Sequence, residues 1–152
     1  MISKTQKETI KKFFEAVEKV VHGPGEIYDL GLVISDNLKL KDLVKFAPRP
    51  EEIEIFDLSE KTSSEFVEVL LNVFKKKKWI LVEVVDGYLP EEVYNKLRFL
   101  SINNHLQFFD GKSDTDIKIP IETRIIFLIN KKSASQINNP NFINLFGPVI
   151  KI

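Results

Sequence analysis

Short apolar runs alternate with segments of helical periodicity along this chain. Ile27–Ser35, Trp79–Val85 and Thr123–Asn130 are almost entirely apolar and too short for core helices, which predicts strands buried on both faces. Glu52–Leu58 alternates with a period of two, and Gly147–Ile152 is typical of a short last strand. Strands that alternate with helices favour a parallel sheet with helices on both sides. The sequence therefore predicts a three-layer α/β/α fold around a mainly parallel five-stranded sheet, with the runs that begin at Trp79 and Thr123 near its centre.

The segments between the strands carry apolar residues at helical spacing. The predicted helices are Lys7–Val21, Leu38–Phe46, Ser59–Lys78 and Leu89–Leu106. Asp110-Gly111 marks a hairpin-like insertion, and a polar stretch rich in Asn and Ser before the last strand is a helix or a loop. We expect one domain, with an N-terminal helix and turn over residues 1–25 and the core over 26–152.

Composition excludes several classes of function. Lysine plus arginine equals aspartate plus glutamate at 22 each, so no overall charge draws the chain toward nucleic acid or an anionic membrane. The absence of cysteine excludes disulfides and thiolate metal sites, and His22 and His105 lack the spacing of metal ligands. No apolar run reaches membrane-spanning length, and the N-terminus lacks the apolar region of a signal peptide. We expect a cytoplasmic protein without a metal site or a membrane partner.

Chemistry in such a fold is expected beyond the carboxyl ends of the strands. Those positions are Ser35–Lys41, Asp57, Val85–Gly87 and Asn130. The stretch Ile80–Pro90, "ILVEVVDGYLP", reads as a buried strand that ends in acidic residues and a turn.

The order of these segments and their strand ends resembles the core subdomain of the AAA+ family of P-loop ATPases over residues 26–152. In that family the first strand runs into a phosphate loop, the third ends in the two Walker B acids, and the fourth ends in a polar sensor residue. The short fifth strand follows an arginine finger. The resemblance implies a phosphate loop at Ser35–Asp42, a magnesium-binding acid at Glu83 or Asp86, and a sensor at Asn130.

The phosphate loop departs from the family's G-x-x-x-x-G-K-[ST] pattern at three positions. Only Lys41 matches, because Ser35 and Leu40 replace the glycines and Asp42 replaces the hydroxyl that binds magnesium. Glycines let backbone N–H groups wrap phosphates, and Leu40 brings a side chain to a place of close approach. Lys41 is either a vestige of that loop or a surface lysine on an amphipathic helix.

The remaining catalytic positions depart from the family as well. With Glu83 as the magnesium acid, Val84 stands where the catalytic base belongs, and a valine cannot accept a proton. With Asp86 as the acid, Gly87 follows it and the second acid is again missing. Asn130 is either the sensor or a strand-terminating residue that bonds its own turn.

Asn144-Leu145-Phe146 stands where many relatives carry Ser-Arg-Phe, so the finger arginine is missing, and we expect no helical lid over adenine. These departures predict a vestigial nucleotide site without ATP hydrolysis and without firm binding of ATP or magnesium. The positions of that vestigial site are Ser35, Lys41, Asp42, Glu83, Asp86 and Asn130.

A chain of this kind is expected to work by contact, as a scaffold or adaptor subunit of a protein assembly. Silent AAA+ members exist, and the chain is similar to the delta-prime subunit of bacterial clamp loaders in lacking a working phosphate loop, which implies a setting in DNA replication or repair. Phe142, Leu145 and Phe146 either pack beneath the last strand or form an interface, and we expect at least one to be exposed and the chain to associate with itself or another subunit. Lys75–Lys78 form either a weak phosphate contact or a solvated helix end.

A different class of function stays open. An α/β enzyme or an ATP-binding protein could use Asp57, Glu83, Asp86 and Asn130 around a divalent cation, because carboxylate and amide oxygens at strand ends are suitable ligands.

Overall fold

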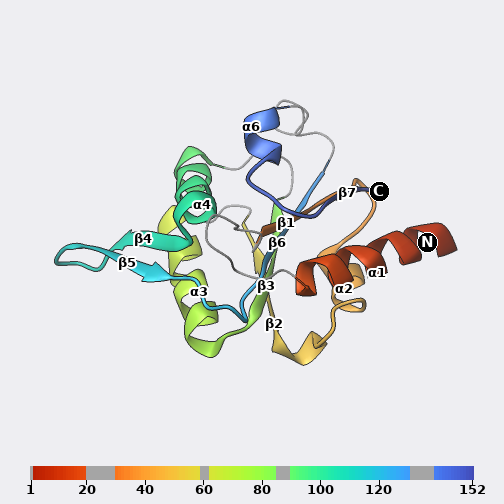
Figure 1. Ribbon diagram of the computed structural model, residues 1–152, viewed down its shortest axis with the longest axis horizontal. Coiled ribbons are helices and arrows are strands. Elements are labelled where there is room, and N and C mark those ends of the chain that lie inside the picture. Colours follow the sequence, from red (N-terminus) through yellow and green to blue (C-terminus); the bar gives the residue numbers. More distant parts are fainter. Residues whose placement is uncertain (1, 20–29, 59–61, 85–89, 131–138) are drawn as a thin grey trace.

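The computed structural model describes residues 2–19, 30–58, 62–84, 90–130 and 139–152. Its main sheet has five strands, all parallel, in the order β2-β3-β6-β1-β7 (Figure 1). The strands are β1 (Leu30–Ile34), β2 (Ile53–Asp57), β3 (Trp79–Val84), β6 (Ile125–Ile129) and β7 (Val149–Lys151). The predicted fold class is confirmed: β6 is the middle strand and β3 lies beside it.

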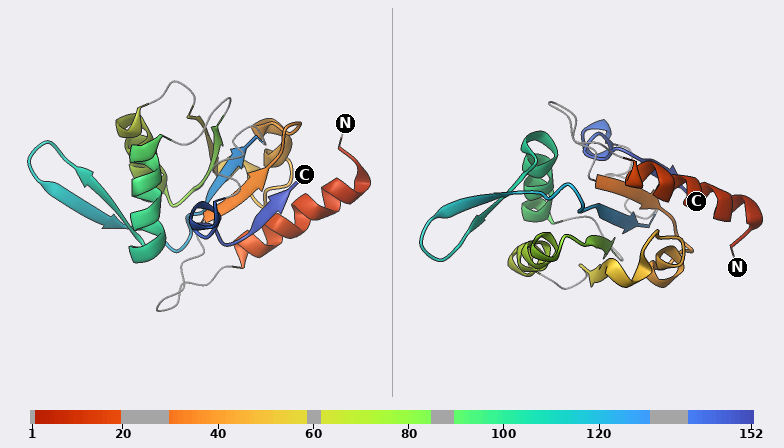
Figure 2. Two further views of the ribbon diagram at one scale, coloured as in Figure 1. Left: turned by 90° about the horizontal axis from the view of Figure 1, so that it is seen from above. Right: turned by 60° about the horizontal axis from the view of Figure 1, so that its bottom comes forward.

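The sheet is covered on both faces, which explains why β1 and β6 lack polar side chains. On one face α1 (Lys4–Glu18) and α2 (Leu40–Val44) pack against alternate residues of the strands. On the other face lie α3 (Ser63–Lys76), α4 (Glu91–Asn103) and α6 (Pro140–Ile143). Figure 2 shows α1 and the pair α3–α4 on opposite sides of the strands. Every residue of β1 and β6 is buried as a result.

Local sequence signals explain where the long helices begin and end. Ser3 and Gln6 form a capping box at the start of α1, and Thr62 and Glu65 form another at the start of α3. Lys77 ends α3 in the left-handed conformation, with φ at 55°. The helix predicted over Leu38–Phe46 is shorter than expected, because α2 covers only Leu40–Val44.

Gly31 in β1 lets α1 lie close to the sheet. A Cβ at this position would lie 2.9 Å from Cζ of Phe13 and 3.2 Å from Cγ2 of Val17. A side chain at this position would therefore require the side chains of Phe13 and Val17 to shift.

The expected insertion is a two-stranded antiparallel hairpin of β4 (His105–Phe109) and β5 (Asp114–Lys118), apart from the main sheet. Gly111 lies in the loop between the two strands with φ at 97°, which only glycine adopts readily. Asp110 completes the turn, because its carboxylate accepts from the backbone N–H groups of Lys112 and Ser113 at 2.8 and 3.0 Å. Figures 1 and 2 show the hairpin projecting away from the body beyond α4.

Candidate functional site

The carboxyl ends of β1, β6 and β3 lie side by side. The register pairs Ile34 of β1 with Ile129 of β6, and Ile129 with Val84 of β3. Ser35 follows directly, and its N–H donates to the carbonyl of Ile129 at 3.0 Å. The chain leaves β1 toward α2 on one face, whereas the strand after β6 is reached by way of α6 on the other. Ligands of parallel sheets bind at such a reversal, which makes the carboxyl ends of β1 and β6 the place where a site is expected.

Two backbone N–H groups of the loop after β1 are hydrogen-bonded to the side chain of Ser35 in the same loop. Ser35 is buried, and its Oγ accepts hydrogen bonds from the backbone N–H groups of Asn37 and Leu38, both at 3.2 Å. In a phosphate loop such N–H groups point at the nucleotide. Here they are already satisfied within the chain.

The start of α2 is likewise occupied by the chain's own groups. A carboxylate oxygen of Asp42 accepts from the N–H of Lys39 at 3.1 Å. Leu38 and Leu40 are buried in the cluster beneath α1 and α2, while Lys41 is exposed on the surface. Lys41 thus lies on the exposed side of a short amphipathic helix, and Asp42 puts negative charge where a phosphate would need positive charge.

Glu83 lies on the α2 face of β3, next to Asp57 of β2, with which it is in register. Burial raises the pKa of Glu83 above its ordinary value, the charge of Asp57 raises it further, and the charge of Lys39 partly offsets both. Val84 points to the opposite face and is buried, so the next side chain after Glu83 is core packing. Asp86 lies outside the described residues, and Asn130 is half-buried and engaged in contacts of its own.

Among the described residues, Asp57 and Glu83 are not part of a larger set of possible metal ligands. Across the ranges that the structure describes, no group of three or more His, Cys, Asp or Glu side chains could hold a metal ion.

The expectation that Phe142, Leu145 or Phe146 is exposed is wrong. All three are at least 93% buried, since their exposed fractions are 1%, 7% and 7%. The ring of Phe142 lies between Tyr94 and Phe146, with centroids at 6.2 and 5.3 Å, and Phe146 meets Phe127 of β6 at 5.9 Å. Core aromatics from three separate segments hold the turn against the sheet, so these side chains offer no apolar surface.

Lys75–Lys78 lie at the end of α3 and the start of the turn to β3. Lys75, Lys76 and Lys77 are exposed, and Nζ of Lys77 lies 3.9 Å from a carboxylate oxygen of Glu122. The lysines therefore stand where cations suit a helix end.

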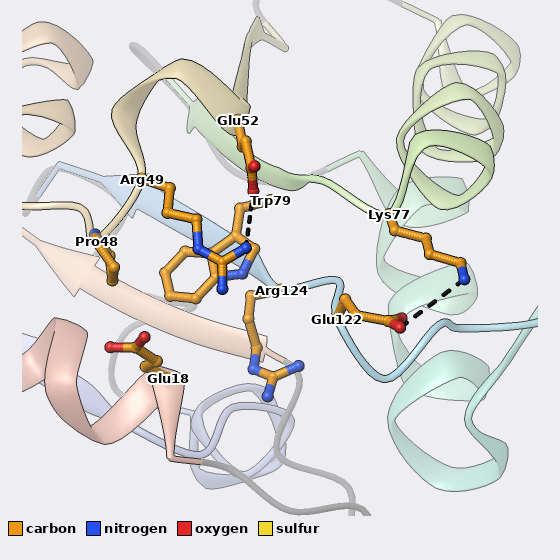
Figure 3. Close-up of a pocket in the computed structure, with 8 residues that line it drawn as sticks. All are labelled: Glu18, Pro48, Arg49, Glu52, Lys77, Trp79, Glu122 and Arg124. Carbon is orange, nitrogen blue, oxygen red and sulfur yellow. Dashed lines mark hydrogen bonds and ion pairs between the residues drawn. The ribbon is translucent and has the colours of Figure 1, made fainter.

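A cavity lined mainly by charged residues lies at the amino ends of the strands and was not predicted from the sequence. It has a volume of about 290 Å³ and lies where β2, β3 and β6 begin. Its lining side chains, drawn in Figure 3, are Glu18, Pro48, Arg49, Glu52, Lys77, Trp79, Glu122 and Arg124. Polar residues just before three parallel strands are the signal that could have located it, because such strands begin at the same edge.

Arg124 is the buried member of that cavity. Its Nε donates to the carbonyl of Val17 at 2.9 Å, and Nη1 donates to the carbonyls of Thr123, at 2.9 Å, and Ile121. Arg124 thus joins the end of α1 to the start of β6. The other charged pairs of the cavity, Arg49–Glu52 at 3.2 Å and Lys77–Glu122, are exposed (Figure 3).

No protein-family model matches the chain, and a search of curated proteins finds no match to its sequence. Among the described helices, none has the length and apolar character needed to cross a membrane.

Proposed function

We propose that this protein is a non-catalytic AAA+-like module that works by contact, as a scaffold or adaptor subunit of a protein assembly. The strand order supports this proposal. In the AAA+ family the phosphate loop, the magnesium acid and the sensor must meet around one nucleotide. Here β6, which Asn130 follows, lies between β1, which Ser35 follows, and β3, which ends at Val84. This convergence requires such an order.

The observation that carries the proposal is the closed loop after β1. Its two N–H groups donate to Ser35 Oγ, and the N–H of Lys39 donates to Asp42. Phosphate binding would have to break these hydrogen bonds and tolerate the Asp42 carboxylate, while gaining only the exposed Lys41. Phosphoryl transfer depends on positioning and on charge stabilisation, and the chain also has a buried valine at the base position and no arginine in Asn144–Phe146.

Calorimetric titration with magnesium-ATP, together with an ATPase assay, tests the nucleotide part of the proposal. We expect no saturable heat at millimolar ATP and no phosphate release above the buffer rate. Lys41→Ala is the matched control, since an exposed lysine without a ligand should change neither readout. Saturable binding or turnover that Lys41→Ala abolishes would show that the loop opens and holds nucleotide.

One observation favours a second candidate, an enzyme or ion-binding protein with a carboxylate site: Asp57 and Glu83 are neighbours in register at one sheet edge. Thermal unfolding with and without Mg²⁺ or Mn²⁺ separates the two candidates. A bound ion at a hundred times its Kd raises the free energy of unfolding by about 2.7 kcal/mol. The carboxylate site requires such a gain and its loss in Asp57→Asn, whereas the contact module predicts no metal-dependent change in either protein.

A further inference from the structure

Exposed apolar side chains of the described residues gather in the β4–β5 hairpin and in the residues that flank it. Four of the five large hydrophobic residues exposed among those described lie within residues 102–121: Ile102, Phe109, Ile117 and Ile121, at 63%, 67%, 39% and 64% exposure. At its base, buried Leu106 and Ile119 anchor the hairpin to the core. A hairpin that is anchored at its base and exposes Phe109 and Ile117 is a candidate interaction surface.

The hydrogen-bond pattern shows which backbone groups of the hairpin point outward. Asp110 donates to Ser113 at 3.2 Å and Ile119 donates to Asn104 at 3.0 Å, so these are hydrogen-bonded pairs of the antiparallel ladder. Hydrogen-bonded and non-hydrogen-bonded pairs alternate between them. The backbone groups of Asp114, Asp116 and Lys118 therefore face away from β4.

The two outer edges of the hairpin differ. On the β4 side, the carbonyl of Gln107 accepts from Nζ of Lys96 at 2.9 Å, and α4 lies alongside. On the β5 side, no other described strand pairs with the edge. An unpaired edge is a template for another strand.

We propose that the outer edge of β5 pairs antiparallel with the same edge of a second copy of this chain. This inference rests on the proposed function, because it names the partner that a contact module needs. In a twofold pairing, residues whose backbone groups face away from β4 must lie opposite each other, so the registers that overlap most are centred on Thr115, Asp116 or Ile117. A centre at Thr115 sets Asp114 against Asp116 of the other copy twice. A centre at Asp116 sets two carboxylates against each other, whereas a centre at Ile117 places Asp116 opposite the partner's Lys118 twice.

The register centred on Ile117 is therefore selected, because it alone pairs opposite charges without setting like charges against each other. Ile117 meets its own copy on the twofold axis, which covers an exposed apolar side chain. Asp114 falls opposite Pro120 of the other copy, and because proline has no N–H the ladder ends there. The result is a four-stranded sheet with a short central pairing, in the order β4-β5-β5-β4.

Sedimentation velocity of the full chain, from micromolar to several hundred micromolar loading, tests this dimer. We expect a concentration-dependent dimer for the wild type. Asp116→Lys and Lys118→Asp should each weaken the dimer at least tenfold, and the double variant should restore it, since the charges are exchanged and stay complementary. Asp114→Lys makes the same charge change on the same strand but faces Pro120, so it should leave the dissociation constant within about threefold.

A wild type that stays monomeric at every loading overturns the inference, as does a dimer that Asp116→Lys leaves intact. A dimer that only Asp114→Lys disrupts overturns the register, because Asp114 meets Lys118 only when the axis passes through Asp116. Thermal unfolding of each variant shows that the fold is kept, which is expected since these side chains are exposed. Magnesium-ATP titration of the same samples reports on the proposed function separately: nucleotide binding by a dimer would contradict that function and leave the hairpin pairing in place.

Discussion

The carboxyl ends and the amino ends of the strands in the five-stranded sheet are built in opposite ways. At the carboxyl edge, where ligands of parallel sheets usually bind, Ser35 and Asp42 accept hydrogen bonds from the chain's own N–H groups, and Leu38 and Leu40 are buried beneath them. At the amino edge, charged side chains surround a cavity, and Arg124 joins α1 to β6. Topology thus shows where a site could form, and side-chain chemistry decides whether that place stays open.

We expect the free energy of unfolding to fall most when the polar anchor at the amino ends of the strands, Arg124, is removed. Arg124→Met removes donors from the buried carbonyls of Val17 and Thr123, and we expect the free energy of unfolding to fall by about 2–4 kcal/mol. Urea unfolding measures the change.

Arg49→Met is the matched control for Arg124→Met. The Arg49 side chain is 70% exposed and its ion pair with Glu52 lies at the surface, so the change should stay within about 0.5 kcal/mol. Equal losses for the two variants would contradict an anchoring role for Arg124.

We expect a smaller loss of stability when the anchor at the carboxyl ends of the strands, Ser35, is removed. Ser35→Ala leaves the N–H groups of Asn37 and Leu38 without their acceptor, and we expect a loss of about 1–2 kcal/mol in urea unfolding. Ser64→Ala, at an exposed position in α3, should cost less than about 0.5 kcal/mol. A Ser35→Ala protein as stable as the Ser64→Ala protein would mean that the serine does not hold the loop.

The smallest effect is the pH dependence contributed by Glu83. Its pKa is raised in the folded state, so the folded protein holds the proton more tightly than the unfolded chain. This contribution is fully present below the ordinary glutamate pKa and is lost as the pH rises through the higher folded value. Glu83→Gln should therefore gain relative stability between acidic and neutral pH, by about 0.5 kcal/mol or less because the group is largely solvated.

Chemical denaturation of the wild type and Glu83→Gln across that pH range measures the difference. Asp57→Asn should reduce the same slope, since the Asp57 charge is one cause of the shift. A relative stability that falls with pH would reverse the sign and contradict the placement of Glu83.

Most of the fold could be predicted because its strands are buried on both faces, which leaves apolar runs that no helix fits. The hairpin was predicted from Asp110-Gly111, whose turn chemistry is local. That Ser35, Val84 and Asn130 lie at the same end of the sheet could be predicted because the carboxyl ends of parallel strands face the same way.

The rest depended on contacts between distant segments. Whether Phe142 and Phe146 are exposed is decided by Tyr94 and Phe127, and no local pattern carries that information. That Ser35 Oγ turns back onto two N–H groups depends on the backbone path of the loop. The cavity around Arg124 lies at the amino ends of the strands, whereas ligand sites of parallel sheets are expected at the carboxyl ends.

The most direct test of the closed loop is the behaviour of two backbone N–H groups in solution. A ¹⁵N-labelled sample should show the N–H resonances of Asn37 and Leu38 unchanged by magnesium-ATP up to millimolar concentration. The same resonances should shift, and exchange with solvent faster, in Ser35→Ala. Saturable shifts of these two resonances on adding ATP to the wild type would contradict the account, because they would show that the loop opens to hold phosphate.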